Sequence, residues 1–212
     1  MSKKTTSSPA IFHYKGLTIE LHPDVYDPAE DTFLLLNTIT IDSNERILEL
    51  GAGCGLIALE CARRGARILC TDINPFAVQL TRYNIERNRH ILKGQIQVRQ
   101  GNLFSVIKKN ERFDIVIFNP PYLPTTPAET GGDWFDIATD GGRDGLRVTK
   151  QFLHDLPKHL TPHGQAYFIF SSLSPQGTLE RFLKKERLTA RIVASQRFES
   201  ETLDVYCVSP TD

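Results

Sequence analysis

Short apolar runs that alternate with segments of helical pattern constrain the fold of this chain more than any other feature. Strands connected through helices pair in parallel, because each crossover returns the chain to the same end of the sheet. The sequence therefore predicts an α/β fold with a doubly wound, mostly parallel sheet. The expected strands are 46–50, 67–72, 95–100, 113–118 and 166–170.

The two ends of the chain depart from this alternation. Two late runs, 190–198 and 202–208, have no helix between them and are expected to form a terminal antiparallel hairpin. Residues 1–10 are rich in Ser, Thr and Lys and are expected to be a flexible N-terminus. Residues 11–212 have the length of one domain with a sizeable core.

One helix start carries capping signals. Asp27 is suited to cap it, Pro28 fits the first turn, and Glu30 completes a capping box. This helix is expected to bury three apolar residues: Phe33, Leu34 and Leu36.

Three later segments give more general predictions. Residues 123–145 form a Pro/Thr/Gly-rich loop of a length that is functional or disordered in compact domains. A helix is expected from Leu146 to Leu160, with a kink at Pro157. Another helix is expected over 179–187.

Composition narrows the functional classes. Lys+Arg and Asp+Glu both number 25, and this balance argues against a large nucleic-acid surface. The four cysteines form no C-x-x-C pair, so no metal site or disulfide framework is expected, and Cys61 and Cys70 fit a core. The N-terminus lacks the apolar region of a signal peptide and no apolar run spans a membrane, so a cytoplasmic protein is expected.

A glycine-rich turn after the first strand marks a candidate ligand site. Gly51, Gly53 and Gly55 allow a ligand to approach the backbone closely and leave helix N–H groups free. Asp72 ends the second strand about 20 residues later, where an acid can accept both hydroxyls of a ribose. The alternative is a tight turn with an acid beside a helix.

The G-x-G-x-G spacing differs from the dinucleotide fingerprint, and ELGAGCG (49–55) resembles the first motif of class I S-adenosyl-L-methionine (AdoMet) methyltransferases. This resemblance implies that Asp72 holds the ribose and that Glu49 helps to hold the methionine amino group. It places Asn102 and Leu103 at the adenine. Many members have Asp at the first of these positions, and Asn102 can still accept from the adenine amino group and donate to a ring nitrogen.

The stretch FNPPYLP (118–124) ends the fourth expected strand in an amide held between rigid residues. Its NPPY motif resembles that of methyltransferases acting on planar nitrogens, which are poor nucleophiles. The resemblance makes Asn119, Pro120 and Tyr122 catalytic candidates, with Asn119 also beside the cofactor, and Asn119, Pro121 and Tyr122 substrate contacts. The side-chain carbonyl of Asn119 and the backbone carbonyl of Pro120 can accept the two hydrogens of the substrate nitrogen. Catalysis would then consist mostly of positioning the substrate. A rigid turn with a core tyrosine is the alternative.

The whole set of motifs resembles the HemK-type release-factor glutamine methyltransferases, in their short archaeal and eukaryotic branch. The matching stretches are VYDPAEDTFLLL (25–36), LELGAGCG (48–55), CTDINP (70–75), FDIVIFNPPYLP (113–124) and DGGRDG (140–145). The bacterial branch carries an additional N-terminal helical domain, for which this chain has no room. The resemblance implies AdoMet-dependent N5-methylation of the glutamine amide in the GGQ loop of a class I peptide chain release factor.

The resemblance also implies a small zinc-binding activator subunit. The edge strand at 95–100 is a candidate docking point by strand addition, although a protected edge needs no partner. By resemblance the helix opened by Glu30, Asp31 and Thr32 covers the cofactor, which makes Thr32 a cofactor contact; as capping residues they would look the same.

The motifs leave some roles and functions open. Gly141–Gly145 is a lid hinge or a turn, Arg143 braces the loop or touches substrate, and Trp134 is a substrate anchor or a local core residue. Two other functions compete: an adenine-N6 methyltransferase acting on DNA or RNA, and a non-catalytic AdoMet-binding interaction protein.

Overall fold

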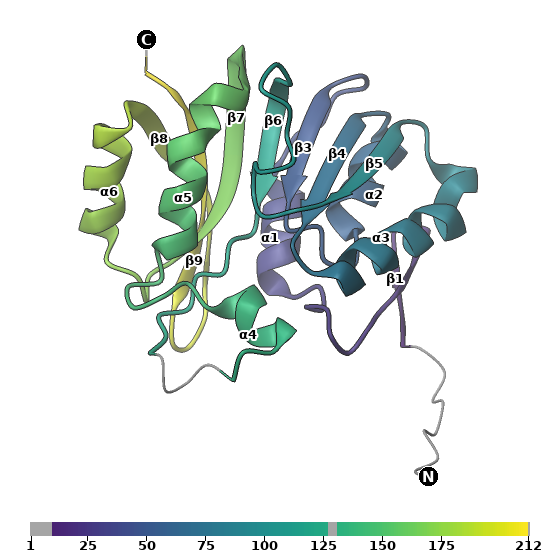
Figure 1. The fold of residues 1–212 in the computed structure, drawn as a ribbon, viewed down its shortest axis with the longest axis horizontal. Helices are drawn as coiled ribbons and strands as arrows, with labels where there is room; N and C mark the ends of the chain where they lie inside the picture. The colour runs from purple at the N-terminus through teal and green to yellow at the C-terminus, as the bar shows by residue number, and fades with distance from the viewer. Residues whose placement is uncertain (1–9, 127–130, 212) are drawn as a thin grey trace.

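A seven-stranded sheet forms the centre of the computed structural model, which describes residues 10–126 and 131–211 (Figure 1). The strand order is β5-β4-β3-β6-β7-β9-β8; β3 to β7 are parallel, and β9 is antiparallel to both β7 and β8. The prediction of a mostly parallel sheet with a C-terminal hairpin is confirmed. The bounds are β3 Arg46–Leu50, β4 Arg67–Asp72, β5 Gln95–Gln100, β6 Phe113–Phe118, β7 Leu160–Ser171, β8 Leu188–Arg197 and β9 Thr202–Pro210.

Helices cover both faces of this sheet. One core cluster joins one face to α1 (Glu30–Thr38), α2 (Leu56–Arg64) and α3 (Pro75–Asn88). A second cluster joins the opposite face to α5 (Arg147–Asp155) and α6 (Gln176–Lys185), as Figure 1 shows. Successive strand residues point to opposite faces, so the central strands must be apolar on both sides.

The strand order reverses between β3 and β6, which are neighbours in the sheet although β4 and β5 lie between them in sequence. Their register places Leu50 opposite Phe118. The glycine turn and the NPPY segment therefore leave the sheet side by side, where doubly wound folds bind their ligands.

A separate N-terminal hairpin was not predicted from the sequence. It consists of β1 (Ile11–Tyr14) and β2 (Leu17–Glu20), and Leu17 and Ile19 are completely buried. The predicted flexible segment 1–10 lies almost entirely outside the described residues.

The helix predicted to start at Asp27 starts later. It begins at Glu30 with Ala29 as the N-cap, whose N–H donates to Thr32 Oγ1 at 3.5 Å, so the predicted capping by Asp27 is wrong. Of the three apolar residues predicted to be buried, Leu36 is buried, and Phe33 and Leu34 are half-buried against the core; Leu35 is buried as well.

Two corrections concern the chain after NPPY. The predicted long loop contains a short helix, α4 (Trp134–Thr139), capped by Asp133. The predicted helix 146–160 ends at Asp155, because Pro157 cannot continue it; a 3-10 turn spans Leu156–His159, and Leu160 opens β7. The predicted helix 179–187 lies earlier, at Gln176–Lys185.

No helix within 10–126 and 131–211 is long and apolar enough to cross a membrane.

Candidate active site

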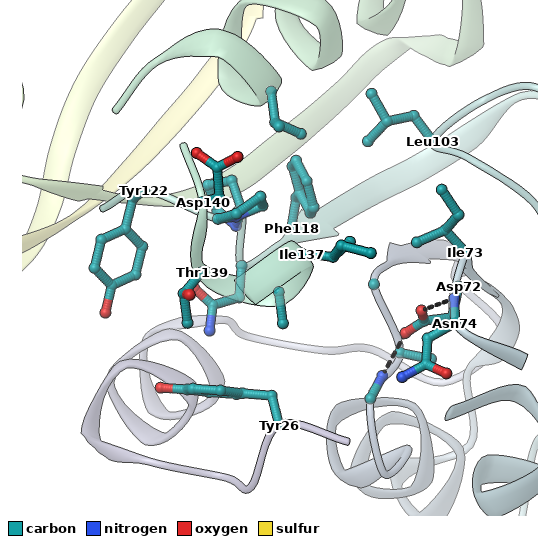
Figure 2. Close-up of a pocket in the computed structure, with 18 of the residues that line it drawn as sticks. Tyr26, Asp72, Ile73, Asn74, Leu103, Phe118, Tyr122, Ile137, Thr139 and Asp140 are labelled. Atoms are coloured by element: carbon teal, nitrogen blue, oxygen red, sulfur yellow. Dashed lines mark hydrogen bonds between the residues drawn. The ribbon is translucent and has the colours of Figure 1, made fainter. Parts of the chain in front are cut away.

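A cavity of about 1110 Å³ opens where the strand order reverses. Its wall comes from the segment before α1, the turns after β3, β4, β5 and β6, and α4 and α5. Figure 2 shows Ile73 and Leu103 at one end of this cavity and Tyr26 and Tyr122 at the other, with Ile137 between them. We call the first end, with the glycine turn, the donor half, and the second end, with NPPY, the acceptor half.

The glycine turn and Asp72 form one hydrogen-bonded unit in the donor half. Gly51 and Gly53 adopt positive φ angles of 71° and 54°, which a side chain would strain. The Gly53 N–H donates to Asp72 Oδ2 (2.9 Å) and the Asn74 N–H to Asp72 Oδ1 (2.8 Å), drawn as dashed lines in Figure 2. Burial raises the pKa of Asp72 even so.

Glu49 is a buried acid with an unused oxygen. Only 3% of its surface is exposed, and its Oε2 atom has no hydrogen-bond partner within the described residues. Burial, and then the charge of Asp72, raise its pKa well above the usual range. An orphaned acceptor that lines a cavity is costly unless a cationic or hydrogen-bond donor ligand pairs with it.

The far wall of the donor half comes from the turn after β5. Asn102 and Leu103 line the cavity. Leu103 has a φ of 47°, a left-handed conformation that is uncommon for a residue with a side chain. Ile73 stands across from it and is 45% exposed within this open space. The two apolar side chains form a slot for a flat group.

The amide of Asn119 is oriented by a carboxylate that is distant in sequence. Its Nδ2 donates to Asp31 Oδ2 at 3.0 Å, while its Oδ1 is buried and has no partner in the described part of the chain. An amide held by its nitrogen presents its oxygen on the other side. Asn119 lines the cavity, and its Oδ1 atom is an acceptor that no described group uses.

Asp31 also binds both tyrosines of the acceptor half. The Tyr26 and Tyr122 hydroxyls donate to Asp31 Oδ2 at 3.1 and 3.2 Å, and the Thr32 N–H donates to Oδ1 at 2.6 Å. Burial, and then the charge of Asp31, raise the pKa values of both tyrosines above their usual value. Both phenols therefore stay protonated, as donors to Asp31, at any physiological pH.

The DGGRDG segment braces the chain that follows NPPY. Leu123 and Asp140 form a parallel bridge, and the Thr125 N–H donates to the Gly142 carbonyl at 3.0 Å. Asp140 is also paired with Arg147 at 2.6 Å. The segment thus forms a hydrogen-bonded turn next to α4, whose Trp134 lines the cavity.

Most of the predicted site residues share this one cavity. It is lined by Thr32, Glu49, Gly51, Gly53, Asp72, Asn102, Leu103, Asn119, Pro120, Pro121 and Tyr122. Gly55 is not among the lining residues; with a φ of 85° it caps α2, and a Cβ there would lie 2.9 Å from Thr81 Cγ2. Its requirement for glycine comes from packing.

Sequence reasoning missed the partners that organise the acceptor half. Asp31 was seen only as a helix-opening residue, and Tyr26 and Ile137 were not considered. The signal for Asp31 was its place inside the VYDPAEDTFLLL stretch. All four cysteines are buried and free, which confirms Cys61 and Cys70 as core residues. Burial raises the pKa of Cys54, beside the glycine turn, to about 12, so this thiol is not a nucleophile.

Comparisons with known proteins agree with this geometry. The family model described as "Methyltransferase small domain" matches residues 19–131. A putative protein N5-glutamine methyltransferase of Methanocaldococcus jannaschii is 37% identical over 190 residues, covering 89% of this chain and 92% of that protein. Methyltransferase HEMK2 of Homo sapiens is 33% identical over 191 residues, covering 86% and 88%. The chain belongs to the HemK-type methyltransferases.

A solved structure with the same fold is the Mtq2–Trm112 complex of E. cuniculi, described as responsible for methylation of the termination factor eRF1. It aligns with a TM-score of 0.68 at 22% identity, covering 89% of this chain and 99% of that one. As a HemK-type methyltransferase, this protein is an enzyme that requires a methyl donor.

Proposed function

We propose that this protein methylates the side-chain amide of the glutamine in the GGQ loop of a class I peptide chain release factor, with AdoMet as the donor. The observation that carries the proposal is the unpaired Asn119 Oδ1, held in place through the bond from Nδ2 to Asp31. Relatives named release factor glutamine methyltransferase and eRF1 methyltransferase catalytic subunit support the choice of substrate.

The donor half fits AdoMet. The orphaned Glu49 Oε2 suits the amino group of the methionine part, Asp72 suits the ribose hydroxyls, and the slot between Ile73 and Leu103 suits adenine. AdoMet carries no phosphate group, so the glycine turn that receives it needs no phosphate-binding cradle. When bound, AdoMet supplies an electrophilic methyl group on a sulfonium sulfur.

The acceptor half would orient the nucleophile. Asn119 Oδ1 accepts one hydrogen of the substrate amide and the Pro120 carbonyl accepts the other. Both contacts strengthen as the nitrogen rehybridises and its hydrogens become more positive, so they stabilise the transition state more than the ground state. An N-methylated amide nitrogen that still carries both hydrogens is a strong acid, so no strong base is needed to remove one.

The overall charge balance argues against the adenine-N6 alternative, because Lys+Arg and Asp+Glu both number 25. Charges near the cavity are mixed: Arg147, Lys150 and Lys185 line it, whereas the exposed acids Asp24, Asp27, Glu30 and Asp133 belong to the adjoining segments without lining it. A filter-binding assay at low salt would detect the strong, salt-dependent binding that this alternative requires.

The β5 edge supports a partner of the kind in the Mtq2–Trm112 complex. β5 is one of the two end strands of the sheet in the described part of the chain, with Ile96 and Val98 half-buried along it. We propose that a small zinc-binding activator adds a strand here. The isolated chain should then be poorly soluble or weakly active and should gain activity with the activator; full activity of a stable monomer would remove this proposal.

Mass spectrometry of a release factor incubated with AdoMet and this chain tests the function. The expected result is one added methyl group on the GGQ glutamine, with more product when the activator subunit is present. A release factor with that glutamine replaced by alanine, and the enzyme variant Asn119→Ala, serve as matched controls. Methylation of DNA or RNA adenine instead, or no transfer to any of these substrates with the activator present, would reject the proposal.

A further inference from the structure

The buried polar face of α3 contacts both the glycine turn and the N-terminal hairpin, two parts of the molecule that no catalytic role connects. Thr81, Asn84 and Asn88 are at most 1% exposed, yet each is polar. Buried polar side chains in a helix are costly unless their hydrogen bonds are satisfied. Here the partners are backbone groups of the glycine turn and of β2.

Two of these side chains bond to the backbone of β2 in the way that a neighbouring strand would. Asn84 accepts from the Glu20 N–H (2.8 Å) and donates to the Glu20 carbonyl (3.0 Å). Asn88 makes the same pair with Thr18, at 2.8 and 2.9 Å. Four helix residues rise about 6 Å and two strand residues about 6.6 Å, so amides on successive helical turns match alternate residues of a strand.

Asn84 and Asn88 each donate one further hydrogen bond through Nδ2, to different acceptors. Asn88 donates to the Asn84 carbonyl within α3 at 2.7 Å, whereas Asn84 donates to the Cys54 carbonyl of the glycine turn at 2.9 Å. One turn earlier on α3, the Thr81 hydroxyl donates to the neighbouring Gly53 carbonyl at 2.9 Å. Both carbonyls belong to the turn whose N–H groups and φ angles shape the donor half.

The hairpin also leads directly into the cavity wall. After β2 the chain continues through Val25, Tyr26 and Pro28, all of which line the cavity. The Asn74 side chain fixes this segment by donating to the Asp24 carbonyl at 2.7 Å. The family model begins at residue 19, so β1 and the start of β2 lie outside it.

We propose that Asn84 is a positioning residue of the methyl-donor site, which fastens the glycine turn to the N-terminal hairpin, and that this hairpin is part of the donor-binding unit. Asn84 touches no substrate. It holds the Cys54 carbonyl so that the turn keeps the shape that receives the donor. This inference rests on the proposed function in one respect: its binding experiment uses AdoMet as the donor.

The pair Asn84→Ala and Asn88→Ala tests the inference. Each variant removes one matched pair of bonds to β2, but only Asn84→Ala frees the glycine turn. By titration calorimetry we expect Asn84→Ala to weaken AdoMet binding about tenfold, the scale of one lost hydrogen bond, while Asn88→Ala stays close to the wild type. Thermal melting should show that both variants fold and lose similar stability.

A second readout does not depend on the donor. Hydrogen exchange of the backbone amides in residues 51–56, without ligand, should accelerate in Asn84→Ala and not in Asn88→Ala. If Asn84→Ala fails to fold, Thr81→Val removes the neighbouring brace on Gly53 at nearly constant volume and should give the same two effects.

Three results would overturn the inference: equal loss of affinity in the two asparagine variants, unchanged affinity in Asn84→Ala, or exchange in the turn that responds to neither. A wild-type protein that does not bind AdoMet would reject the proposed donor, and the exchange experiment would then decide on the brace alone.

Discussion

The donor half of the cavity joins residues that are near in sequence, whereas the acceptor half joins residues far apart. The bond between Gly53 and Asp72 spans 19 positions, within one strand–helix–strand unit. The bonds from Asn119 and Tyr122 to Asp31 span 88 and 91 positions. The Gly53–Asp72 bond forms within its local unit, whereas the bonds to Asp31 require α1 to dock against the sheet, where it packs on β7, β8 and β9, and this closes a much longer loop.

The difference indicates what each half can tolerate. The donor half depends on backbone shape and on two buried acids, so single changes there should affect affinity. The acceptor half depends on one carboxylate that receives three side-chain donors at a single oxygen, so changes there should affect turnover. The following variants separate these two expectations.

Asn119→Ala should have the largest effect. It removes the acceptor of the acceptor half, and we expect kcat to fall about 10²-fold or more, as for other lost preorganised polar contacts. AdoMet affinity, measured by calorimetry, should barely change.

Asn119→Asp is the companion variant. It would place a second carboxylate where Nδ2 now lies 3.0 Å from Asp31, so repulsion should disturb the acceptor half as well. Near-wild-type turnover of a GGQ peptide by Asn119→Ala would show that the amide does not orient the substrate.

Asp72→Ala should come next and should act on the donor half alone. We expect AdoMet binding to weaken by roughly 1–3 kcal/mol, the scale of lost hydrogen bonds to a charged acceptor. At saturating donor kcat should recover. A variant with unchanged affinity would remove Asp72 from the donor site, and one with a lasting loss of kcat would mean that the two halves are not separable.

Asp31→Asn should reduce kcat about tenfold and leave AdoMet affinity intact. The new amide keeps the shape of the carboxylate but loses the charge that strengthens the bonds from Asn119, Tyr26 and Tyr122. The decrease should therefore be smaller than for Asn119→Ala. Loss of donor binding instead of turnover would assign Asp31 to the donor half.

The pH response of Glu49 should give the smallest effect. The pKa of Glu49 is higher in the folded than in the unfolded state, so its contribution to the free energy of unfolding is complete only below the unfolded pKa. This contribution is lost as the pH rises through the folded pKa. Without donor, Glu49→Gln should therefore melt at or above the wild-type temperature at neutral pH, and the gap should close on acidification.

Donor binding should show the opposite trend for the same residue. The ammonium group of the proposed donor AdoMet would pair with the ionised form, so wild-type affinity should fall as Glu49 takes up its proton, while Glu49→Gln should bind weakly at every pH. Calorimetry from acidic to alkaline pH checks both curves. A wild-type affinity that does not depend on pH would mean that Glu49 does not face the amino group.

The sequence by itself determined the features that local backbone chemistry encodes. Alternating apolar runs were sufficient for the parallel sheet, and Gly51 and Gly53 mark positive φ angles that few other residues adopt. NPPY marks a rigid strand end because proline fixes its own φ. These features bring Asp72 and Asn119 to the same edge of the sheet, so both could be named from their positions.

Only the tertiary structure decided how those residues are oriented. The side on which Asn119 presents its oxygen depends on Asp31, and Asp31 reaches it only after α1 has packed against the sheet. Asn84 likewise acquires its brace from β2 and Cys54, which are distant in the chain. Hydrogen bonds between side chains are short and directional, so they follow from the packed positions of whole elements, which periodicity and motif spacing do not specify.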